Sequence, residues 1–188
     1  MGNTNLKPVC NVNLNAYTGL WYQFSTNLLT SIQATGPFSY SVTAEYQKID
    51  DKGTISVKNR ALNTNYKVQG IDGISYPTSP DCPGARKVSF PGVPFDGDYI
   101  IVKLGPIVKG KYEYAIVLGP FPLIGYYMNG SINPNGCGLY VLVRNPNNFA
   151  QKYFCEVNDY LRENGFNKFF NKQLLTANAL PKPVCNKN

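Results

Sequence analysis

Histidine is absent from the 188 residues of this chain. Its absence removes the usual general base near neutral pH, every Ser-His or Cys-His nucleophile pair, and the commonest ligand of transition metals. Carboxylate, Tyr and Lys chemistry stays open. We nevertheless expect a protein that is not an enzyme and that holds neither a metal nor another cofactor.

Charged residues are also scarce. They make up 15% of the chain, with 11 Asp and Glu against 18 Lys and Arg. The net charge of +7 would suit a nucleic acid or an anionic membrane, but the basic residues are scattered along the chain. The largest local excesses, at 86–87 and 103–111, contain no run of five or six basic residues. We therefore expect no nucleic-acid partner, and peripheral contact with a membrane remains open.

Long hydrophobic runs are missing, because no apolar stretch approaches the 18 residues that a membrane-spanning helix needs. Residues 1–6 also lack the apolar core of a signal peptide. The five cysteines are widely spaced without a Cys-x-x-Cys pair, which argues against zinc and favours disulfides formed in an oxidising compartment. We expect a secreted or otherwise extracytoplasmic protein whose signal has been removed, with one cysteine left free or paired between two chains.

The chain is rich in aromatic and β-branched residues, with 14 Tyr and 10 Phe. Segments of this composition alternate with short Gly, Pro, Asn and Asp clusters, the pattern of strands and turns. Gly53 supplies the positive φ of a predicted hairpin turn, and Gly70 and Gly73 indicate sharp bending. The eight predicted strands are 17–26, 39–49, 54–62, 66–76, 85–90, 98–104, 112–118 and 137–144.

The spacing of apolar residues changes after the eighth predicted strand. It becomes about 3.6 residues and predicts a helix over about 148–164. Asn147 or Asn148 is placed to cap its start and Gly165 to end it. A short last strand is predicted over 174–176. The fold class is therefore all-β: an eight-stranded antiparallel up-and-down barrel with one C-terminal α-helix packed outside. Its predicted parts are a lead-in (1–15), the barrel with its helix (16–178) and a tail (179–188).

Two motifs resemble those of the lipocalin family. The segment 19–21, Gly-Leu-Trp, resembles the Gly-x-Trp signature that opens the first strand. Arg144, at the end of the eighth predicted strand, resembles the late signature whose Arg packs over that Trp. Segments 85–90, 98–102 and 114–117 are similar to the bacterial lipocalin and apolipoprotein D branch, and the likeness covers roughly residues 12–176.

The resemblance implies structural roles for three residues. Gly19 would let the chain bend tightly into the barrel floor, Trp21 would fill that floor, and Arg144 would stack on the indole ring. By the same resemblance the lead-in and the tail would be tied to the barrel wall. The implied disulfides are Cys10–Cys137 and Cys82–Cys185, which leaves Cys155 as a thiol on the helix, free or linking two chains.

The barrel interior is the candidate ligand site. Strand alternation, anchored on Trp21 and Arg144 and extended by the resemblance, selects one face of each strand, and a slip of one residue would reverse any of them. Plain core packing is the alternative role for each residue. Lys67, Arg86 and Lys103 are candidates to attract an anionic head group. The predicted inward residues are Val42, Ala44, Tyr46, Val57, Asn59, Val88, Phe90, Tyr99, Ile101, Ala115, Val117, Tyr140 and Leu142.

The leading functional hypothesis is binding and transport of a small hydrophobic ligand such as a fatty acid, phospholipid, sterol, retinoid or tetrapyrrole, by a monomer or weak homodimer. The chain departs from the family where Val117–Pro120 replaces the frequent Thr-Asp-Tyr signature, and where 119–136 forms a long connection. Its apolar tip, 121–128, either packs on the barrel or serves as a lid, a membrane contact or a partner surface. An interaction protein with a filled barrel is therefore the alternative. A lipocalin-like isomerase is a third hypothesis, for which Glu45, Asp98 and Glu113 are the strand acids to consider.

Overall fold

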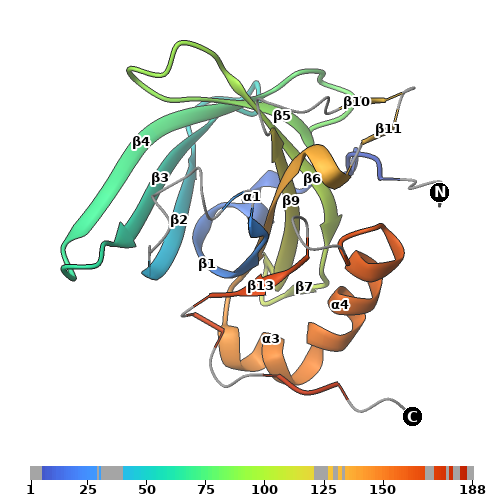
Figure 1. The fold of residues 1–188 in the computed structure, drawn as a ribbon. Helices are drawn as coiled ribbons and strands as arrows, with labels where there is room; N and C mark the ends of the chain where they lie inside the picture. The colour runs from blue at the N-terminus through green and yellow to red at the C-terminus, as the bar shows by residue number, and fades with distance from the viewer. Residues whose placement is uncertain are drawn as a thin grey trace.

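Eight long strands dominate the computed structural model of the chain (Figure 1). The structure describes residues 6–28, 30, 40–120, 127–128, 131–132, 134–167, 172–176, 178–179 and 183–185. The long strands are β1 (Gly19–Thr26), β2 (Tyr40–Lys48), β3 (Ile55–Leu62), β4 (Val68–Pro77), β5 (Ala85–Ser89), β6 (Gly97–Leu104), β9 (Tyr114–Pro120) and β12 (Cys137–Val143). Short strands are β7 (Ile107–Val108), β8 (Lys111–Tyr112), β10 (Tyr127–Met128), β11 (Ser131–Ile132) and β13 (Leu174–Leu175).

The long strands close into a barrel. Each pairs antiparallel with its neighbours in the order β1-β2-β3-β4-β5-β6-β9-β12, and β12 returns to β1 through pairs such as Tyr22 with Val143. This confirms the predicted eight-stranded antiparallel barrel. The predicted last strand is β13, which adds to β1 opposite Ser25 and Thr26.

The two ends of the barrel differ. A one-turn helix, α1 (Leu14–Tyr17), precedes β1 and lies at the closed end, where Asn13 accepts a hydrogen bond from the Ala16 amide at 3.2 Å. At the other end, the open end, β4 outruns β5. Val68–Ser75 pairs with β3, but only Ile74–Pro77 pairs with β5. The 3₁₀ turn η1 (Pro134–Gly136) leads into β12 at this end.

The predicted single helix consists of two helices, α3 (Pro146–Lys152) and α4 (Phe154–Glu163). Tyr153 lies between them with φ −121°, outside helical geometry. The cap of α3 is Asn145 rather than Asn147 or Asn148, because its side chain accepts from the Asn148 amide at 3.0 Å and Pro146 occupies the first helical position. Gly165, with φ +89°, ends α4 as predicted.

Two apolar cores lie on either side of the barrel wall. The inner core fills the lower barrel. The outer core lies between the outside of β1, β6, β9 and β12 and the helices, and contains Phe24, Phe149 and Val157, all at most 1% exposed. None of the described helices is long and apolar enough to cross a membrane. The inner core consists of Ala16, Tyr17, Trp21, Ala44, Tyr46, Ile55, Val57, Ile101, Tyr112, Ala115, Val117 and Leu142, with further partly buried residues packed against it.

The cysteine pairing implied by the family resemblance is wrong. The disulfides are Cys10–Cys82 and Cys155–Cys185, so Cys155 is not the thiol that remains. Backbone hydrogen bonds hold the lead-in beside the loop that follows β4, since the Gly84 amide donates to the Val9 carbonyl at 3.1 Å. That loop carries Cys82. Cys137 instead faces the outer core from the end of β12 that pairs with Pro120, away from the closed end.

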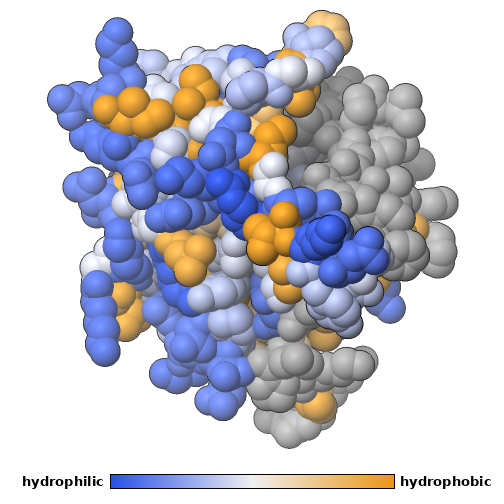
Figure 2. All heavy atoms as spheres, turned by 90° about the vertical axis from the view of Figure 1, so that its left-hand side faces the viewer, coloured by the Kyte–Doolittle hydropathy of each residue, from blue (hydrophilic) through white to orange (hydrophobic). Residues whose placement is uncertain are grey.

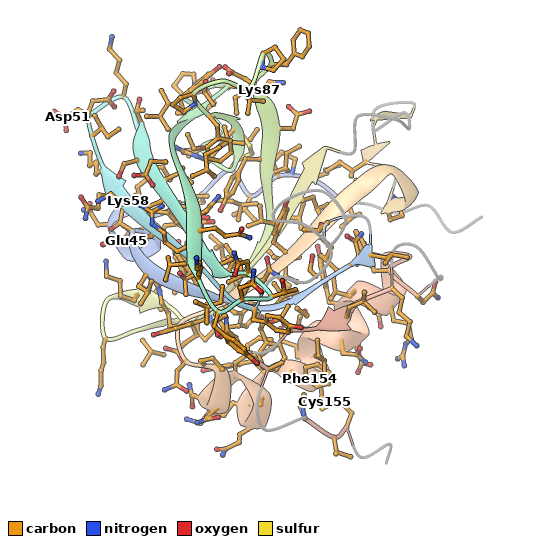
Figure 3. All side chains as sticks on the ribbon, turned by 60° about the vertical axis from the view of Figure 1, so that its left-hand side comes forward. Glu45, Asp51, Lys58, Lys87, Phe154 and Cys155 are labelled. Carbon is orange, nitrogen blue, oxygen red and sulfur yellow. A yellow bond between two sulfur atoms is a disulfide. The ribbon has the colours of Figure 1, made fainter. Side chains whose placement is uncertain are left out.

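The Cys10–Cys82 disulfide therefore joins segments that backbone hydrogen bonds already place side by side. Cys155, on α4, meets the C-terminal tail that runs past the helices (Figure 3).

The predicted contact surface 121–128 is described only in part. Its residues 121–126 lie outside the described part of the chain, and 127–128 form β10, which pairs with β11.

Candidate functional site

The floor of the barrel is built around Trp21, which is fully buried. Its indole N–H donates to the Tyr17 carbonyl at 2.8 Å. The guanidinium carbon of Arg144 lies 3.7 Å from the centre of the indole ring. Gly19 has φ +101°, and a Cβ there would lie 3.3 Å from Arg144 Nη1, so both its conformation and its space favour glycine.

Arg144 also fastens α1 to the barrel. Its N–H groups donate to backbone carbonyls of α1 and of neighbouring residues, and burial lowers its pKa to about 10. No described carboxylate forms an ion pair with it. The accepting carbonyls are those of Ala16, Tyr17, Thr18, Leu20 and Tyr112, at 2.6 to 3.3 Å.

A second arginine, Arg86, closes the opposite side of the floor and is 1% exposed. Nε donates to Ser75 Oγ at 3.0 Å, and Nη2 donates to the carbonyls of Gly53 and Ser75 at 2.8 Å each. Nη1 donates to the Pro83 carbonyl at 3.2 Å. Burial lowers the pKa of Arg86. The side chain therefore joins the β2–β3 turn, β4 and the β4–β5 loop.

The sequence indicates that Arg86 points into the barrel. Arg86 shares the phase of Val88 and Phe90, which the alternation places inside the barrel, so Arg86 points inward too. We interpreted it instead as a candidate for attracting an anionic head group. The structure turns its donors toward backbone carbonyls of the closed end.

Three tyrosines meet between the two arginines. Tyr17 and Tyr99 share a hydrogen bond of 2.5 Å between their hydroxyls, and the Tyr99 hydroxyl donates to Tyr46 Oη at 3.0 Å. The rings of Tyr17 and Tyr46 stack with centroids 5.6 Å apart. Burial raises the pKa of Tyr46 to about 12 and raises those of Tyr17 and Tyr99 well above the usual value. All three phenols are therefore protonated near neutral pH. Tyr17 was not among the predicted inward residues, because it lies on α1 and outside the strand alternation.

The structure brings most of the predicted inward residues together. Val42 is half-buried beside an irregularity of the β2–β3 pairing and is outside the inner core. Asn59, half-buried, pairs across the strands with inward-facing Ala44. The predicted residues buried in the inner core are Ala44, Tyr46, Val57, Ile101, Ala115, Val117 and Leu142, and those packed against it are Val88, Phe90, Tyr99 and Tyr140.

Exposure along the inward faces changes from one end of the barrel to the other. On β6 the buried Ile101 precedes the half-buried Tyr99 in the direction of the open end. The same change occurs from Leu142 to Tyr140 on β12 and from Val57 to Asn59 on β3. On these three strands the inward side chains are therefore more accessible toward the open end than at the floor, although Ala61 on β3 and Thr26 on β1 are buried there.

The rim of the open end has a hollow of its own, of about 560 Å³. It lies where β4 outruns β5, and Arg60 and Asp72 form an ion pair beside it. Figure 2 views the side that carries the β3–β4 hairpin and shows hydrophobic residues as separate patches among hydrophilic ones. The residues lining the hollow are Arg60, Val68, Gln69, Gly70, Ile71, Asp72 and Pro91.

The candidate acids of the isomerase hypothesis lie outside the inner core. Glu45 is opposite Lys58 in the β2–β3 ladder, and both project from the outside of the barrel (Figure 3). Asp98 forms an ion pair with Lys87 at 2.7 Å. Glu113 accepts from the Asn148 side chain. In the part of the chain that the structure describes, no three acidic or cysteine side chains gather into a metal site.

Comparisons with known proteins agree on the architecture. A family model described as a lipocalin-like domain matches residues 12–129. The outer membrane lipoprotein Blc of Vibrio cholerae is 36% identical over 116 residues, which are 61% of this chain and 63% of the relative. The match therefore spans less than two thirds of that curated relative.

Solved structures show the same fold at low identity. Apocrustacyanin C2 superposes with a TM-score of 0.60 at 18% identity, covering 94% of this chain and 92% of that one. Lobster apocrustacyanin A1 superposes with a TM-score of 0.61 at 17% identity, covering 95% and 93%. H1 crustacyanin from the lobster Homarus americanus gives 0.58 at 18% identity, covering 89% and 80%.

Proposed function

Since the chain belongs to the lipocalin family, we propose that its barrel binds and carries one small hydrophobic molecule. Family membership supports binding of a small hydrophobic ligand as the general activity. The observation that carries the proposal for this chain is the change in exposure along three inward faces, from buried residues at the floor to partly accessible ones toward the open end, where we place the hollow that holds the ligand. A barrel of eight strands is wide enough to hold one small ligand.

The proposed contacts are the inward side chains above the floor. Val88, Phe90, Tyr99 and Tyr140 offer apolar and aromatic surface that is partly accessible from the open end, and Asn59 adds one amide. An acyl chain that buries about ten methylenes there would gain roughly 8 kcal/mol. Ordering and association costs reduce this gain, so micromolar affinity is the expected range.

Trp21 offers a reporter for this proposal because it is the one tryptophan of the chain and lies on the barrel floor. Retinol absorbs where tryptophan emits, so a molecule bound inside the barrel should quench Trp21 by energy transfer. We expect saturable quenching by one retinol per chain. Displacement by dodecan-1-ol, which does not absorb there, would show that the site accepts a plain hydrocarbon chain.

A matched pair of substitutions separates the interior from the outer surface. Val88→Arg places a charge inside the hollow and should abolish the transfer. Ile74→Arg, on the outward face of the neighbouring strand and 42% exposed, should leave it unchanged. Equal loss in both variants, or no binding of retinol, dodecan-1-ol or a tetrapyrrole by the unmodified protein, would overturn the carrier role.

Exposed apolar residues at the open end favour peripheral contact with a membrane. Tyr66, between β3 and β4, is 80% exposed, and Phe95, between β5 and β6, is 83% exposed. Apolar tips on neighbouring loops can enter the interfacial layer of a bilayer. Such a contact would place the opening of the barrel against the source of a lipid-like ligand.

We place the protein outside the cytoplasm. Its two disulfides suit an oxidising compartment, and the Vibrio cholerae relative is an outer membrane lipoprotein. The intact mass after alkylation without reductant should show one modified cysteine. Five modified cysteines would contradict the proposed location. We also propose a binding role without catalysis, since the strand acids face away from the hollow.

A further inference from the structure

Of the three hydroxyl protons on Tyr17, Tyr46 and Tyr99, one takes part in no hydrogen bond within the group. Three phenols carry three protons, and two hydrogen bonds join them. Tyr99 donates to Tyr46, so the proton between Tyr17 and Tyr99 must come from Tyr17. The remaining proton belongs to Tyr46. Among the described residues no acceptor meets it, although Tyr46 is only 3% exposed.

A second polar group in the barrel also lacks a partner. Gln23 follows Trp21 on the inward face of β1 and pairs with the inward-facing Leu142. The residue is 8% exposed, and its side-chain amide forms no hydrogen bond within the described chain. A buried amide or hydroxyl without a partner is costly. Two such groups facing one apolar interior therefore indicate a ligand that supplies the missing partners.

The charge of that ligand follows from the two arginines. An ionised carboxylate or phosphate inside a protein needs a paired cation or several charge-assisted donors. Arg86 directs its Nε, Nη1 and Nη2 at Ser75 and the carbonyls of Gly53 and Pro83. Arg144 likewise directs its donors at backbone carbonyls. Neither side chain has a pair of N–H groups left to hold an anion, whereas Tyr46 and Gln23 offer neutral ones.

We propose that the barrel selects hydrophobic molecules that end in an uncharged oxygen, a hydroxyl or a carbonyl, which accepts a hydrogen bond from Tyr46. Gln23, four residues along β1 from the Gly19 that pairs with Tyr46, would be a second polar contact nearer the open end. This inference rests on the proposed carrier function and narrows its ligand class. It predicts that a carboxylate on the same hydrocarbon binds more weakly, because neither Arg86 nor Arg144 has a pair of N–H groups to hold it.

Retinol and retinoate provide the comparison, since they share one hydrocarbon and differ in the polar end. Both absorb where Trp21 emits, so one titration measures both dissociation constants. At neutral pH we expect retinol to bind at least tenfold more tightly than retinoate. Retinal, with a carbonyl in place of the hydroxyl, should resemble retinol.

Tyr46→Phe tests the donor itself. Loss of one neutral hydrogen bond should weaken retinol binding about three- to tenfold and leave retinoate binding nearly unchanged. Tyr114→Phe is the matched control, because Tyr114 is a buried phenol of the outer core that donates to Glu156. It should change neither constant.

Gln23→Met provides a test that does not depend on the tyrosines. Removing a buried amide that has no partner should raise the unfolding midpoint of the ligand-free protein while weakening retinol binding. A merely structural role for Gln23 would lower the midpoint and leave binding alone.

The outcomes separate this inference from the carrier function. Retinoate binding as tightly as retinol, or Tyr46→Phe weakening both ligands equally, would overturn the inference and leave the carrier function standing. Absence of binding by all three retinoids and by dodecan-1-ol would overturn both.

Discussion

The closed and open ends of this barrel use similar residues for opposite purposes. At the closed end, aromatic and charged side chains are buried, and the N–H groups of Arg86 and Arg144 meet backbone carbonyls. At the open end, aromatic residues such as Tyr66 and Phe95 lie in solvent, and half of β4 lacks a partner on its β5 side. Stability is therefore concentrated at one end, which leaves the other end available for a ligand and for a membrane.

The largest effect on the stability of the closed end is expected from removing Arg144. Arg144→Ala removes a donor from each of five carbonyl groups at the floor and removes the stack on Trp21. We expect a loss of about 3 to 5 kcal/mol in the free energy of unfolding, measured in urea. Arg162→Ala is the control, since this half-exposed arginine forms an ion pair with nearby Asp159 and should cost less than about 0.5 kcal/mol. Similar losses in the two variants would contradict the role of the floor.

The lead-in disulfide, Cys10–Cys82, tests how much the lead-in contributes to the stability of the closed end. Replacing Cys10 and Cys82 by Ser opens a link between residues 72 apart in the chain. We expect a loss of roughly 2 to 4 kcal/mol, again from urea unfolding. The tail disulfide, Cys155–Cys185, spans 30 residues, so its removal should cost somewhat less. The opposite order would show that the lead-in contributes little to the closed end.

Alkaline pH should remove the stabilising contribution of the protonated Tyr46 on the floor. The folded-state pKa of Tyr46 is raised to about 12, above its value near 10 in the unfolded chain. The protonated phenol is thus favoured by folding. Its stabilising contribution is complete below pH 10 and is lost as pH rises from about 10 to 12.

Tyr46→Phe isolates this contribution from that of the lysines. Between pH 9 and pH 11.5 the unmodified protein should lose roughly 1 to 2 kcal/mol more stability than the variant. Unfolding curves at a series of pH values measure the difference. Parallel curves for the two proteins would exclude Tyr46 as the titrating group.

The smallest effect on stability is expected at the open end. Tyr66→Ser combined with Phe95→Ser should change the free energy of unfolding by less than about 0.5 kcal/mol, because both side chains are more than three-quarters exposed. The same variant should bind vesicles of mixed neutral and anionic phospholipid more weakly in sedimentation. Ile49→Ser, exposed at the turn after β2, is the control. Equal vesicle binding by all three proteins would argue against membrane contact through the open end.

The sequence predicted the barrel well because alternation and turn residues are local signals. All eight strands were located, and the inward phase was right for residues such as Ala44, Val117 and Leu142. The interruption at Tyr153 was not visible, since the apolar stripe continues through it with an unchanged period. Tertiary packing against the barrel, rather than the local pattern, decides where the helix divides.

The cysteine pairs could not be predicted because they depend on which segments lie side by side. Cys10 meets Cys82 only because the backbone of Val9 bonds to Gly84. The tyrosine group likewise joins α1, β2 and β6, three elements far apart in the chain. The inward position of Arg86 follows from the alternation that it shares with Val88, but the backbone carbonyls that it meets come from segments far apart in the chain.

Titration of the protein with retinol, followed by the emission of Trp21, decides whether the barrel interior binds a hydrophobic ligand. We expect saturable energy transfer at one retinol per chain that Val88→Arg abolishes and Ile74→Arg preserves. Transfer that never saturates, or that survives Val88→Arg unchanged, would show that the hollow above the floor is not a binding site.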